Sequence, residues 1–307
     1  MMVKVLYRAL ALLTMSALLF VGCSAAQTYL VGIDADYEPF SYIDENGDAV
    51  GFDVESIQWI AEQNGFEVEI VPVAWDGIIP ALLQKKIDMV YSGMSITPER
   101  EKQVTFSIPY WKVDQGVVVL EDSEATMEEF AAGELIIGVQ RSCSADQYLE
   151  SEDYFGTEMY NDLVASGNIK LYDSFPMSMV ALEQGLVDAV IFDDVNINSY
   201  IQDKTEFVML DIIPTGEEYG VAMRNEDTEL QDIINAGLED LMASDKWTEL
   251  LEKYIIVDES TEDVDEDVAD EDVDEDIADE DVDEDIADDD AEDIDEDVDE
   301  DVDEDEE

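Results

Sequence analysis

Residues 75–100 read WDGIIPALLQKKIDMVYSGMSITPER, and this stretch indicates the fold class. Its first part, residues 76–85, has the pattern of a helix. Residues 87–92 (IDMVYS) follow and predict a buried strand. The stretch ends in Thr97-Pro98-Glu99-Arg100, which is typical of a helix start with Thr97 as N-cap and Pro98 at the first helical position. A helix, a strand and a second helix in succession predict an α/β protein.

The same alternation continues on both sides of this stretch. Residues 29–34 (YLVGID) and 66–73 (FEVEIVPV) are predicted strands. Residues 53–64 predict an amphipathic helix with Asp53 as its N-cap and Gly65 as its end. Further apolar segments follow between helical stretches, namely GVVVL, LIIGV, IKLY, VDAVIF, FVML and YGVAM. We therefore expect α/β lobes built on mainly parallel sheets.

An internal similarity suggests that the chain contains two related units. Residues 81–90 read ALLQKKIDMV and residues 181–190 read ALEQGLVDAV, with Ala, Leu, Gln, Asp and Val shared. Chance similarity between two ordinary helix–strand units is an equally good explanation at this stage. Ligands of α/β proteins bind beyond the carboxyl ends of the strands, so the residues after each copy are informative. They are Ser92–Arg100 after the first copy and Phe192-Asp193-Asp194 after the second.

Arg100 and Asp193 are the candidate ligand-binding charges. Arg100 lies in the first turn of a predicted helix, where the helix dipole disfavours a cation and a nearby anion would compensate. Its planar guanidinium can hold a carboxylate through two hydrogen bonds. Asp193 ends a strand and could hold an ammonium group. A salt bridge within the chain explains Arg100 equally well, and a helix cap explains Asp193.

The chain resembles the family 3 extracellular solute-binding proteins, which capture substrates for polar amino acid ABC transporters. The resemblance covers residues 29–257. It is carried by GIDADYEPFSYIDENGDAVGFDVESIQWIAE, WDGIIPALLQKKIDMVYSGMSITPEREKQVTFSIPYW, GVQRSCSADQY, VDAVIFDD and EEYGVAMR, in this order and spacing.

The resemblance implies a two-lobed, periplasmic-binding-protein-like (type II) α/β fold with two hinge strands. Lobe 1 would comprise residues 29–112 and 219–257, and lobe 2 residues 116–213. In this interpretation Arg100 holds the ligand carboxylate and Asp193 its α-ammonium group. Tyr37 and Trp75 would enclose the ligand side chain, although core packing is the commoner fate of an aromatic residue. Asp34 would meet the end of that side chain, or else serve in a turn.

The resemblance also implies that the remaining ligand contacts come from two loops. These contacts are Gly93, Met94 and Ser95 in lobe 1 and Gln140, Cys143 and Ser144 in lobe 2. The second loop departs from the family, because Ser142 replaces the usual glycine and Cys143 the usual threonine. Arg141 adds a positive charge beside this loop. These changes leave the ligand preference open, and we expect a polar L-amino acid with a cationic or amide side chain.

The N-terminus resembles an export signal. Lys4 and Arg8 precede an apolar run, residues 9–21, which is too short to span a bilayer comfortably. Gly22-Cys23 fits the end of a lipobox, so we expect residues 1–22 to be a signal peptide and residues 23–28 a linker lipidated at Cys23. Cleavage after Ala26 and an uncleaved anchor are alternatives. Each places the protein outside the cytoplasmic membrane, either lipid-anchored to its outer face or periplasmic.

The C-terminal segment, residues 258–307, has a different composition. Asp and Glu make up 35 of its 50 residues, and EDVDEDIAD occurs at 271–279 and again at 280–288. Like charges at this density predict a disordered acidic tail. The remaining residues still hold 47 of the 82 acids against 13 basic residues, which argues against nucleic acid as a partner. The tail has no pattern of a defined metal site, and we expect no metal and no cofactor.

We therefore expect the substrate-binding subunit of an ABC importer, not an enzyme. It would bind a polar L-amino acid as a monomer and deliver it to the transmembrane permease subunits. Two alternatives remain. One is an enzyme of the cyclohexadienyl dehydratase type, which has a similar bilobal fold. The other is a surface protein that interacts with partners through its acidic tail.

Overall fold

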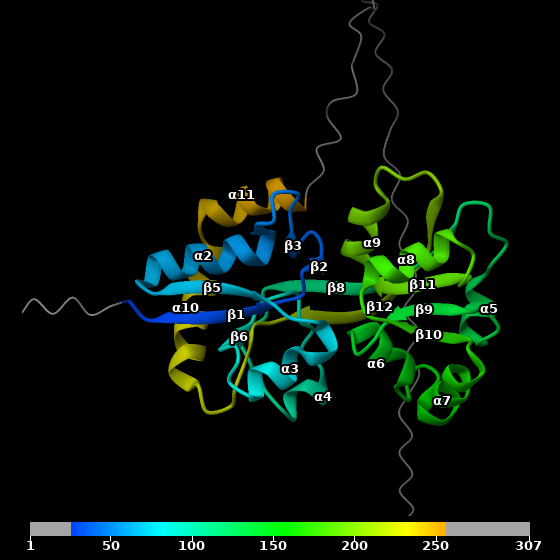
Figure 1. The fold of residues 1–307 in the computed structure, drawn as a ribbon, viewed down its shortest axis with the longest axis horizontal. Helices are drawn as coiled ribbons and strands as arrows, with labels where there is room; N and C mark the ends of the chain where they lie inside the picture. The colour runs from blue at the N-terminus through cyan, green and yellow to red at the C-terminus, as the bar shows by residue number, and fades with distance from the viewer. Residues whose placement is uncertain (1–25, 256–307) are drawn as a thin grey trace, which may run out of the picture. The chain divides into compact units, whose positions relative to one another are not determined.

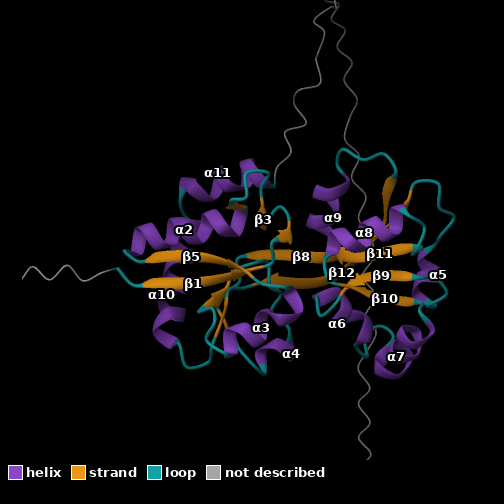
Figure 2. Ribbon diagram, viewed as in Figure 1, coloured by secondary structure: helices purple, strands orange, loops and turns teal. Residues whose placement is uncertain are grey.

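The computed structural model describes residues 26–255. Cys23, the predicted signal peptide and the predicted acidic tail lie outside the described residues. Two five-stranded sheets with helices on both faces form two lobes, and the strands β8 and β12 run from one lobe into the other (Figures 1 and 2). The sheet of lobe 1 has the order β5-β1-β6-β13-β7, and that of lobe 2 the order β10-β9-β11-β8-β12. The predicted α/β class and two-lobed fold are thus confirmed.

The sheet of lobe 1 combines parallel and antiparallel strands. Strand β1 pairs in parallel with β5 and β6, whereas β13 is antiparallel to β6 and β7. Its strands are β1 (Thr28–Ile33), β5 (Glu67–Pro72), β6 (Met89–Val90), β7 (Thr105–Phe106) and β13 (Ala222–Met223). Its helices are α2 (Phe52–Asn64), α3 (Trp75–Leu83), α4 (Pro98–Glu101), α10 (Thr228–Met242) and α11 (Asp245–Tyr254). A small antiparallel sheet of β2 (Asp36–Tyr37), β3 (Ser41–Ile43) and β4 (Ala49–Val50) lies beside them.

The sheet of lobe 2 is also mixed. Strands β9, β10 and β11 are parallel, and β8 and β12 are antiparallel additions. The strands are β8 (Trp111–Leu120), β9 (Ile137–Gln140), β10 (Ile169–Tyr172), β11 (Ala189–Asp193) and β12 (Phe207–Tyr219). The helices are α5 (Met127–Ala131), α6 (Ser144–Glu150), α7 (Gly156–Ser166), α8 (Phe175–Glu183) and α9 (Asp194–Ile201). The expectation of mainly parallel sheets therefore holds only for the strands distant from the hinge.

Two helix ends test the sequence-based reasoning. Gly65 ends α2 in the left-handed conformation, as predicted. The prediction of Asp53 as N-cap is wrong, because α2 begins at Phe52 and its N-cap is Gly51. Asp53 is fully buried, where its Oδ2 accepts hydrogen bonds from Gly93 N at 2.7 Å and Tyr110 Oη at 2.9 Å. A capping-type residue can thus serve a tertiary contact when a loop donor competes for it.

Candidate ligand-binding site

Arg100 occupies a buried position at the start of α4. Thr97 caps the helix through its side chain, which accepts a hydrogen bond from Arg100 N, and Pro98 occupies the first turn as predicted. The Arg100 side chain is only 2% exposed. Its guanidinium donates to the carbonyls of Ser95 at 2.8 Å and Ser142 at 3.3 Å. Within residues 26–255 it forms no salt bridge, so the intrachain ion pair considered from sequence is not present.

Burial of the Arg100 guanidinium has an electrostatic consequence. Desolvation lowers the pKa of Arg100, although nearby acidic groups oppose this effect. Neutral carbonyls offset only part of the free-energy cost of burying a cation, and a bound anion would offset more of it. The guanidinium carbon also lies 5.3 Å from the centre of the Trp75 ring, within the range of cation–π attraction.

Trp75 and Tyr37 present two nearly parallel rings. Their centroids are 6.5 Å apart and their planes differ by 12°. Their nearly parallel faces are surfaces against which a flat group can stack. Trp75 Nε1 donates to the carbonyl of Ser142 in lobe 2 at 3.1 Å. Trp75 is therefore not a simple core residue.

The loop at residues 93–95 is shaped by Tyr37. Gly93 has a φ of +52°, and a Cβ there would lie 2.2 Å from the Tyr37 ring. Glycine is thus required both by the backbone conformation and by the ring. Met94 is fully buried in the core of lobe 1. Ser95 is 1% exposed, and its Oγ has no hydrogen-bond partner among the described residues.

Asp193 is buried at the end of β11. Its Oδ1 accepts from Gln115 Nε2 at 2.6 Å and from Ser144 Oγ at 3.3 Å. Its Oδ2 accepts from Tyr219 Oη at 2.8 Å and from Tyr37 Oη of lobe 1. Asp193 is the N-cap residue of α9, as considered from sequence, but its side chain makes no capping hydrogen bond, so its carboxylate is engaged by the site residues instead.

Asp34 and Gln140 contact one another across the two lobes. Gln140 Nε2 donates to Asp34 Oδ2 at 2.9 Å. Asp34 Oδ1 also accepts from Asp36 N at 3.1 Å, which is the turn role considered from sequence. Burial raises the pKa of Asp34, and these two hydrogen bonds oppose that rise.

In the loop from Arg141 to Ser144, the residues that depart from the family each make a defined contact. Ser142 has a φ of +61°, a conformation in which glycine carries no Cβ penalty, and its carbonyl receives the hydrogen bonds from Trp75 and Arg100. Cys143 caps α6, because its sulfur accepts from Asp146 N at 3.4 Å. Arg141 donates to the carbonyl of Leu171 on β10 at 3.4 Å. Ser144 begins α6, as predicted.

Three residues at this site were missed by sequence reasoning: Gln115 on β8, and Glu217 and Tyr219 on β12. Gln115 Nε2 donates to both Asp193 and Glu217, the latter at 3.2 Å. Tyr219 Oη lies 2.6 Å from Tyr37 Oη. All three come from strands that connect the lobes, and the EEYGVAMR motif, which holds Glu217 and Tyr219, was interpreted as part of the family resemblance without assigning either residue to the site. The two adjacent glutamates before YGVAM were the one available signal.

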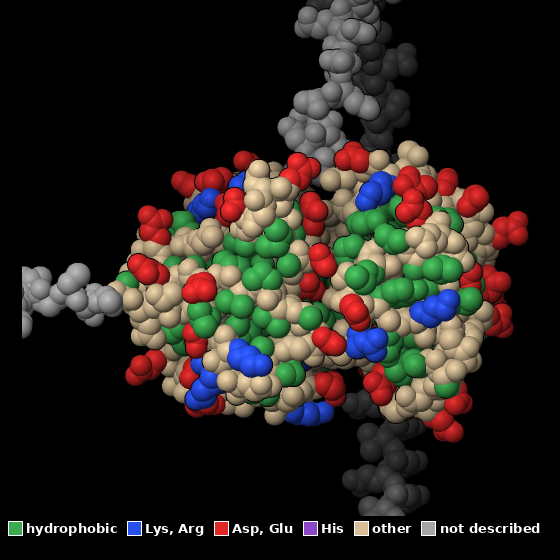
Figure 3. Space-filling model, in the orientation of Figure 1, with side chains coloured by type: hydrophobic (Ala, Val, Ile, Leu, Met, Phe, Trp, Pro, Cys, Tyr) green, Lys and Arg blue, Asp and Glu red, His purple; other side chains and the backbone are tan. Residues whose placement is uncertain are grey.

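Two cavities open beside this group of residues. One, of about 290 Å³, is lined by Trp75, Met94, Arg100, Ser142 and Gln147 among others. The other, of about 430 Å³, includes Ser144, Tyr148, Thr215 and Glu217 in its wall. On the face drawn in Figure 3, acidic side chains border the furrow between the lobes and basic ones are few.

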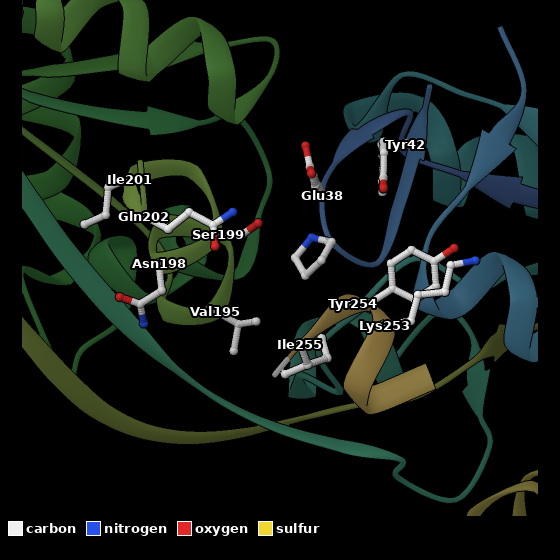
Figure 4. Close-up of a pocket in the computed structure, with 11 residues that line it drawn as sticks. Glu38, Tyr42, Val195, Asn198, Ser199, Ile201, Gln202, Lys253, Tyr254 and Ile255 are labelled. Carbon is white, nitrogen blue, oxygen red and sulfur yellow. The ribbon is translucent and has the colours of Figure 1, made fainter. Parts of the chain in front are cut away.

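A further cavity of about 840 Å³ contains none of the predicted site residues. In Figure 4 side chains of α9, including Val195 and Asn198, face Glu38 and Tyr42 of lobe 1 and the end of α11. Nearby, Asn196 Nδ2 donates to the carbonyl of Glu38 at 2.7 Å and joins the lobes. Within residues 26–255 no helix is long and apolar enough to cross a membrane, and no group of three metal-ligating side chains converges.

Known proteins with similar sequences bind amino acids. The L-arginine-binding protein of Pseudomonas aeruginosa is 30% identical over 259 residues, which cover 81% of this chain and 96% of that protein. The structure of a mutant of ArgBP from T. maritima is 36% identical with a TM-score of 0.65, covering 74% of this chain and 94% of that one.

A third similar protein connects the fold with enzymes. It is the ancestral amino acid-binding protein AncCDT-1, described as a precursor of cyclohexadienyl dehydratase. It is 31% identical with a TM-score of 0.63, and the match covers 75% of this chain and 95% of that one. The sequence profile of one family matches residues 29–257, which is most of the chain. On this evidence the chain belongs to the bacterial extracellular solute-binding proteins, family 3.

Proposed function

We propose that this protein captures a free cationic L-amino acid, with L-arginine as the first candidate, for an ABC importer. One observation carries the proposal: Arg100 is buried between the lobes with no carboxylate partner among the described residues. An amino acid carboxylate would supply that partner through two charge-assisted hydrogen bonds. Asp193 lies in the opposite lobe and contributes the carboxylate that an α-ammonium group needs.

The aromatic pair and the surrounding charges support a cationic side chain. A guanidinium is flat and would stack against Tyr37 and Trp75 better than a tetrahedral group, with cation–π attraction to the rings. Asp34 adds a buried carboxylate nearby. Arg141 directs its guanidinium toward the Leu171 carbonyl on β10, and its charge acts on Asp146. The similarity to proteins named for arginine binding supports the same ligand class.

Binding by lobe closure follows from the contacts between the lobes. Tyr37 contacts Asp193, Gln140 contacts Asp34, and Thr97 Oγ1 donates to Gln147 Oε1 at 3.0 Å. A ligand that touches both lobes would add to these bonds and shift the population toward the closed form. We propose that a permease recognises this closed form.

The cellular arrangement that we propose extends the sequence predictions. Lobe 1 comprises residues 29–112 and 219–257, lobe 2 residues 116–213, and the protein acts as a monomer. Lipidation at Cys23 would hold it at the membrane and raise its concentration near the permease. These predictions concern in part residues outside 26–255.

We propose binding and not catalysis at this site. Its charged groups complement a zwitterion, and Asp193 is held by four donors, which leaves it poorly suited to transfer a proton. The likeness to AncCDT-1 makes an enzyme of the cyclohexadienyl dehydratase type the alternative. Incubation with prephenate and arogenate would yield aromatic products only in that case.

A thermal-shift screen of the proteinogenic amino acids tests the proposal. The protein is first unfolded in denaturant and refolded under dialysis to remove any bound ligand. A ligand that binds only the folded state raises the Tm in proportion to ln(1 + [L]/Kd). We expect L-arginine to give the largest shift and L-glutamate none. Absence of a shift with every amino acid would refute the function, and a largest shift with glutamate or aspartate would refute the ligand class.

A further inference from the structure

Asp193 already has as many donors as its carboxylate can readily accept. Gln115 and Ser144 approach Oδ1, and Tyr37 and Tyr219 approach Oδ2. An ionised carboxylate offers about four lone-pair positions. An ammonium group placed beside Asp193 would therefore gain its charge but would have to displace a donor to form a direct hydrogen bond.

Glu217 provides the acceptor that Asp193 lacks. Its Oε1 accepts from Gln115 Nε2, the same amide nitrogen that donates to Asp193. Its Oε2 is buried and forms no hydrogen bond of normal geometry among the described residues, although the Ser95 and Ser144 side chains approach the carboxylate and oppose the rise of its pKa. Gln115 is 0% exposed, so the amide that links the two carboxylates is a built part of the protein interior. A buried carboxylate oxygen without a donor is costly, and because Glu217 lines a cavity a ligand donor can reach it.

The groups around Glu217 come from five elements. Asp193 on β11 and Arg100 on α4 carry charges, and Tyr148 on α6 and Tyr219 on β12 are titratable neighbours. Gln115 and Ser144 are neutral. Two carboxylates thus face one guanidinium at the position of the ligand main chain. A zwitterion leaves this excess of negative charge unchanged, whereas an additional ligand cation reduces it.

We propose that Glu217 is a second carboxylate anchor for the ligand α-ammonium group, shared with Asp193, and that its charge favours cationic over acidic amino acids. The inference rests on the proposed function. Ser95 Oγ is also buried, and it lies near the Glu217 carboxylate.

A pH dependence of binding follows from this assignment. Burial, followed by the charge of Asp193, raises the pKa of Glu217 in the ligand-free protein. An ammonium group beside Glu217 favours its ionised form and lowers that pKa. Binding therefore releases a proton, and the affinity for L-arginine rises with pH through the ligand-free pKa of Glu217. Arginine itself does not titrate between pH 5 and about 8.

The test compares two ligands and two variants. L-arginine carries the α-ammonium group, and 5-guanidinopentanoate is the same molecule without it. We expect Glu217→Gln to weaken L-arginine binding at least about tenfold, the scale of one charge-assisted hydrogen bond, and to leave the affinity for 5-guanidinopentanoate nearly unchanged. Glu217→Gln should also flatten the rise of L-arginine affinity with pH. Glu218→Gln is the matched control, since Glu218 approaches the exposed Lys112 at 3.9 Å. It should change neither the affinity for L-arginine nor the rise of that affinity with pH.

The outcomes separate the inference from the function on which it rests. Equal losses for both ligands in Glu217→Gln would indicate general disruption and refute the ammonium contact, as would unchanged binding of both. Failure of the wild-type protein to bind any amino acid would refute the function itself. If Glu217→Gln does not fold, the two ligands are compared on Glu217→Ala instead. Calorimetry on the wild-type protein then measures whether binding of L-arginine releases a proton. Release of no proton at any pH from 5 to 8 would overturn the inference.

Discussion

Residues 81–90 and 181–190 form the same helix-to-strand unit in the two lobes. In the first, Asp88 N donates to the Leu30 carbonyl at 2.7 Å and Asp88 Oδ2 accepts from Leu30 N at 3.0 Å. In the second, Asp188 makes the corresponding bonds with Ile136, at 2.7 Å and 2.8 Å. The shared letters of the two segments thus reflect a shared structural unit.

The two units differ in the charge that follows them. After the first, a loop and a short helix carry Arg100; after the second, the strand itself ends in Asp193. A common scaffold therefore brings opposite charges to the two sides of one site. The comparison shows that the unit is structural and that the residues beyond it determine what is bound.

Supporting carboxylates extend the comparison. In lobe 1 Asp53 accepts from Gly93 N and from Tyr110 Oη. In lobe 2 Asp146 accepts from Ser142 N at 2.7 Å and from Tyr160 Oη. Each carboxylate thus holds the backbone of a site loop. They differ in their surroundings, because Arg141 provides a positive charge near Asp146, whereas within residues 26–255 no cation lowers the pKa of Asp53.

The largest expected effect concerns the ligand-facing charge of lobe 1. We expect Arg100→Lys to weaken amino acid binding by roughly 2–3 kcal/mol, because the charge remains but the two-pronged contact is lost. Arg100→Ala should weaken it further. The stability of the ligand-free protein should barely change or should rise, since a buried cation is removed from the positive end of a helix. Calorimetry and ligand-free Tm on the same variants measure both quantities.

Lys102→Ala is a control for the Arg100 variants, since it also removes one positive charge, two residues further along the chain, from an exposed side chain. It should change neither quantity beyond a few tenths of a kcal/mol. Unchanged affinity in Arg100→Ala together with a lower ligand-free Tm would mean that Arg100 is structural, and the site assignment would be wrong.

A smaller effect should distinguish the two supporting carboxylates by pH. Burial raises the pKa of Asp53 to about 8, whereas its unfolded value is about 3.9. Between these values the folded state binds the extra proton, so stability falls as pH rises. Asp53→Asn has no such proton, and its stability relative to the wild type should increase by about 1.4 kcal/mol between pH 6 and 7.

Asp146→Asn is the comparison in lobe 2. Burial raises the pKa of Asp146 too, but hydrogen bonds from Tyr160 and Ser142 and the charge of Arg141 oppose the rise. The stability of Asp146→Asn relative to the wild type should therefore increase less with pH than that of Asp53→Asn. Chemical denaturation of the ligand-free variants at several pH values measures the two slopes. A larger slope for Asp146→Asn would reverse the proposed ranking.

The smallest expected effect concerns the turn inside each unit. Lys85 has a φ of +62° and Gly185 a φ of +64° at corresponding positions. Lys85→Gly should stabilise the protein and Gly185→Ala should destabilise it, each by about 1 kcal/mol, because a Cβ is strained in the left-handed region. Among the described residues the Lys85 side chain forms one exposed ion pair, with Glu226, and losing this pair should change the stability little. Shifts of the same sign in the two variants would contradict this explanation.

Local patterns predicted much of the fold and part of the site. The Thr97-Pro98 start of α4, the glycine end of α2 and the start of α6 at Ser144 depend on neighbours a few residues away, and they are confirmed. The N-cap assignment of Asp53 was wrong because a distant loop amide and a tyrosine hydroxyl bind its carboxylate. The antiparallel hinge pairing was also missed, since it joins β8 and β12 across nearly 100 residues of sequence.

The sequence by itself determined which elements form and which charges end them, because helix periodicity, capping and strand patterns act over short distances. It marked Arg100 and Asp193 as opposite charges after two similar units. Only the tertiary structure decided that Arg100 is buried without a carboxylate partner from residues 26–255 and that Asp193 accepts hydrogen bonds from four donors. It alone brought Gln115 and Glu217 of the hinge strands beside them. Burial and hydrogen-bond partners are properties of segments distant in sequence, and they decide what each charge can still bind.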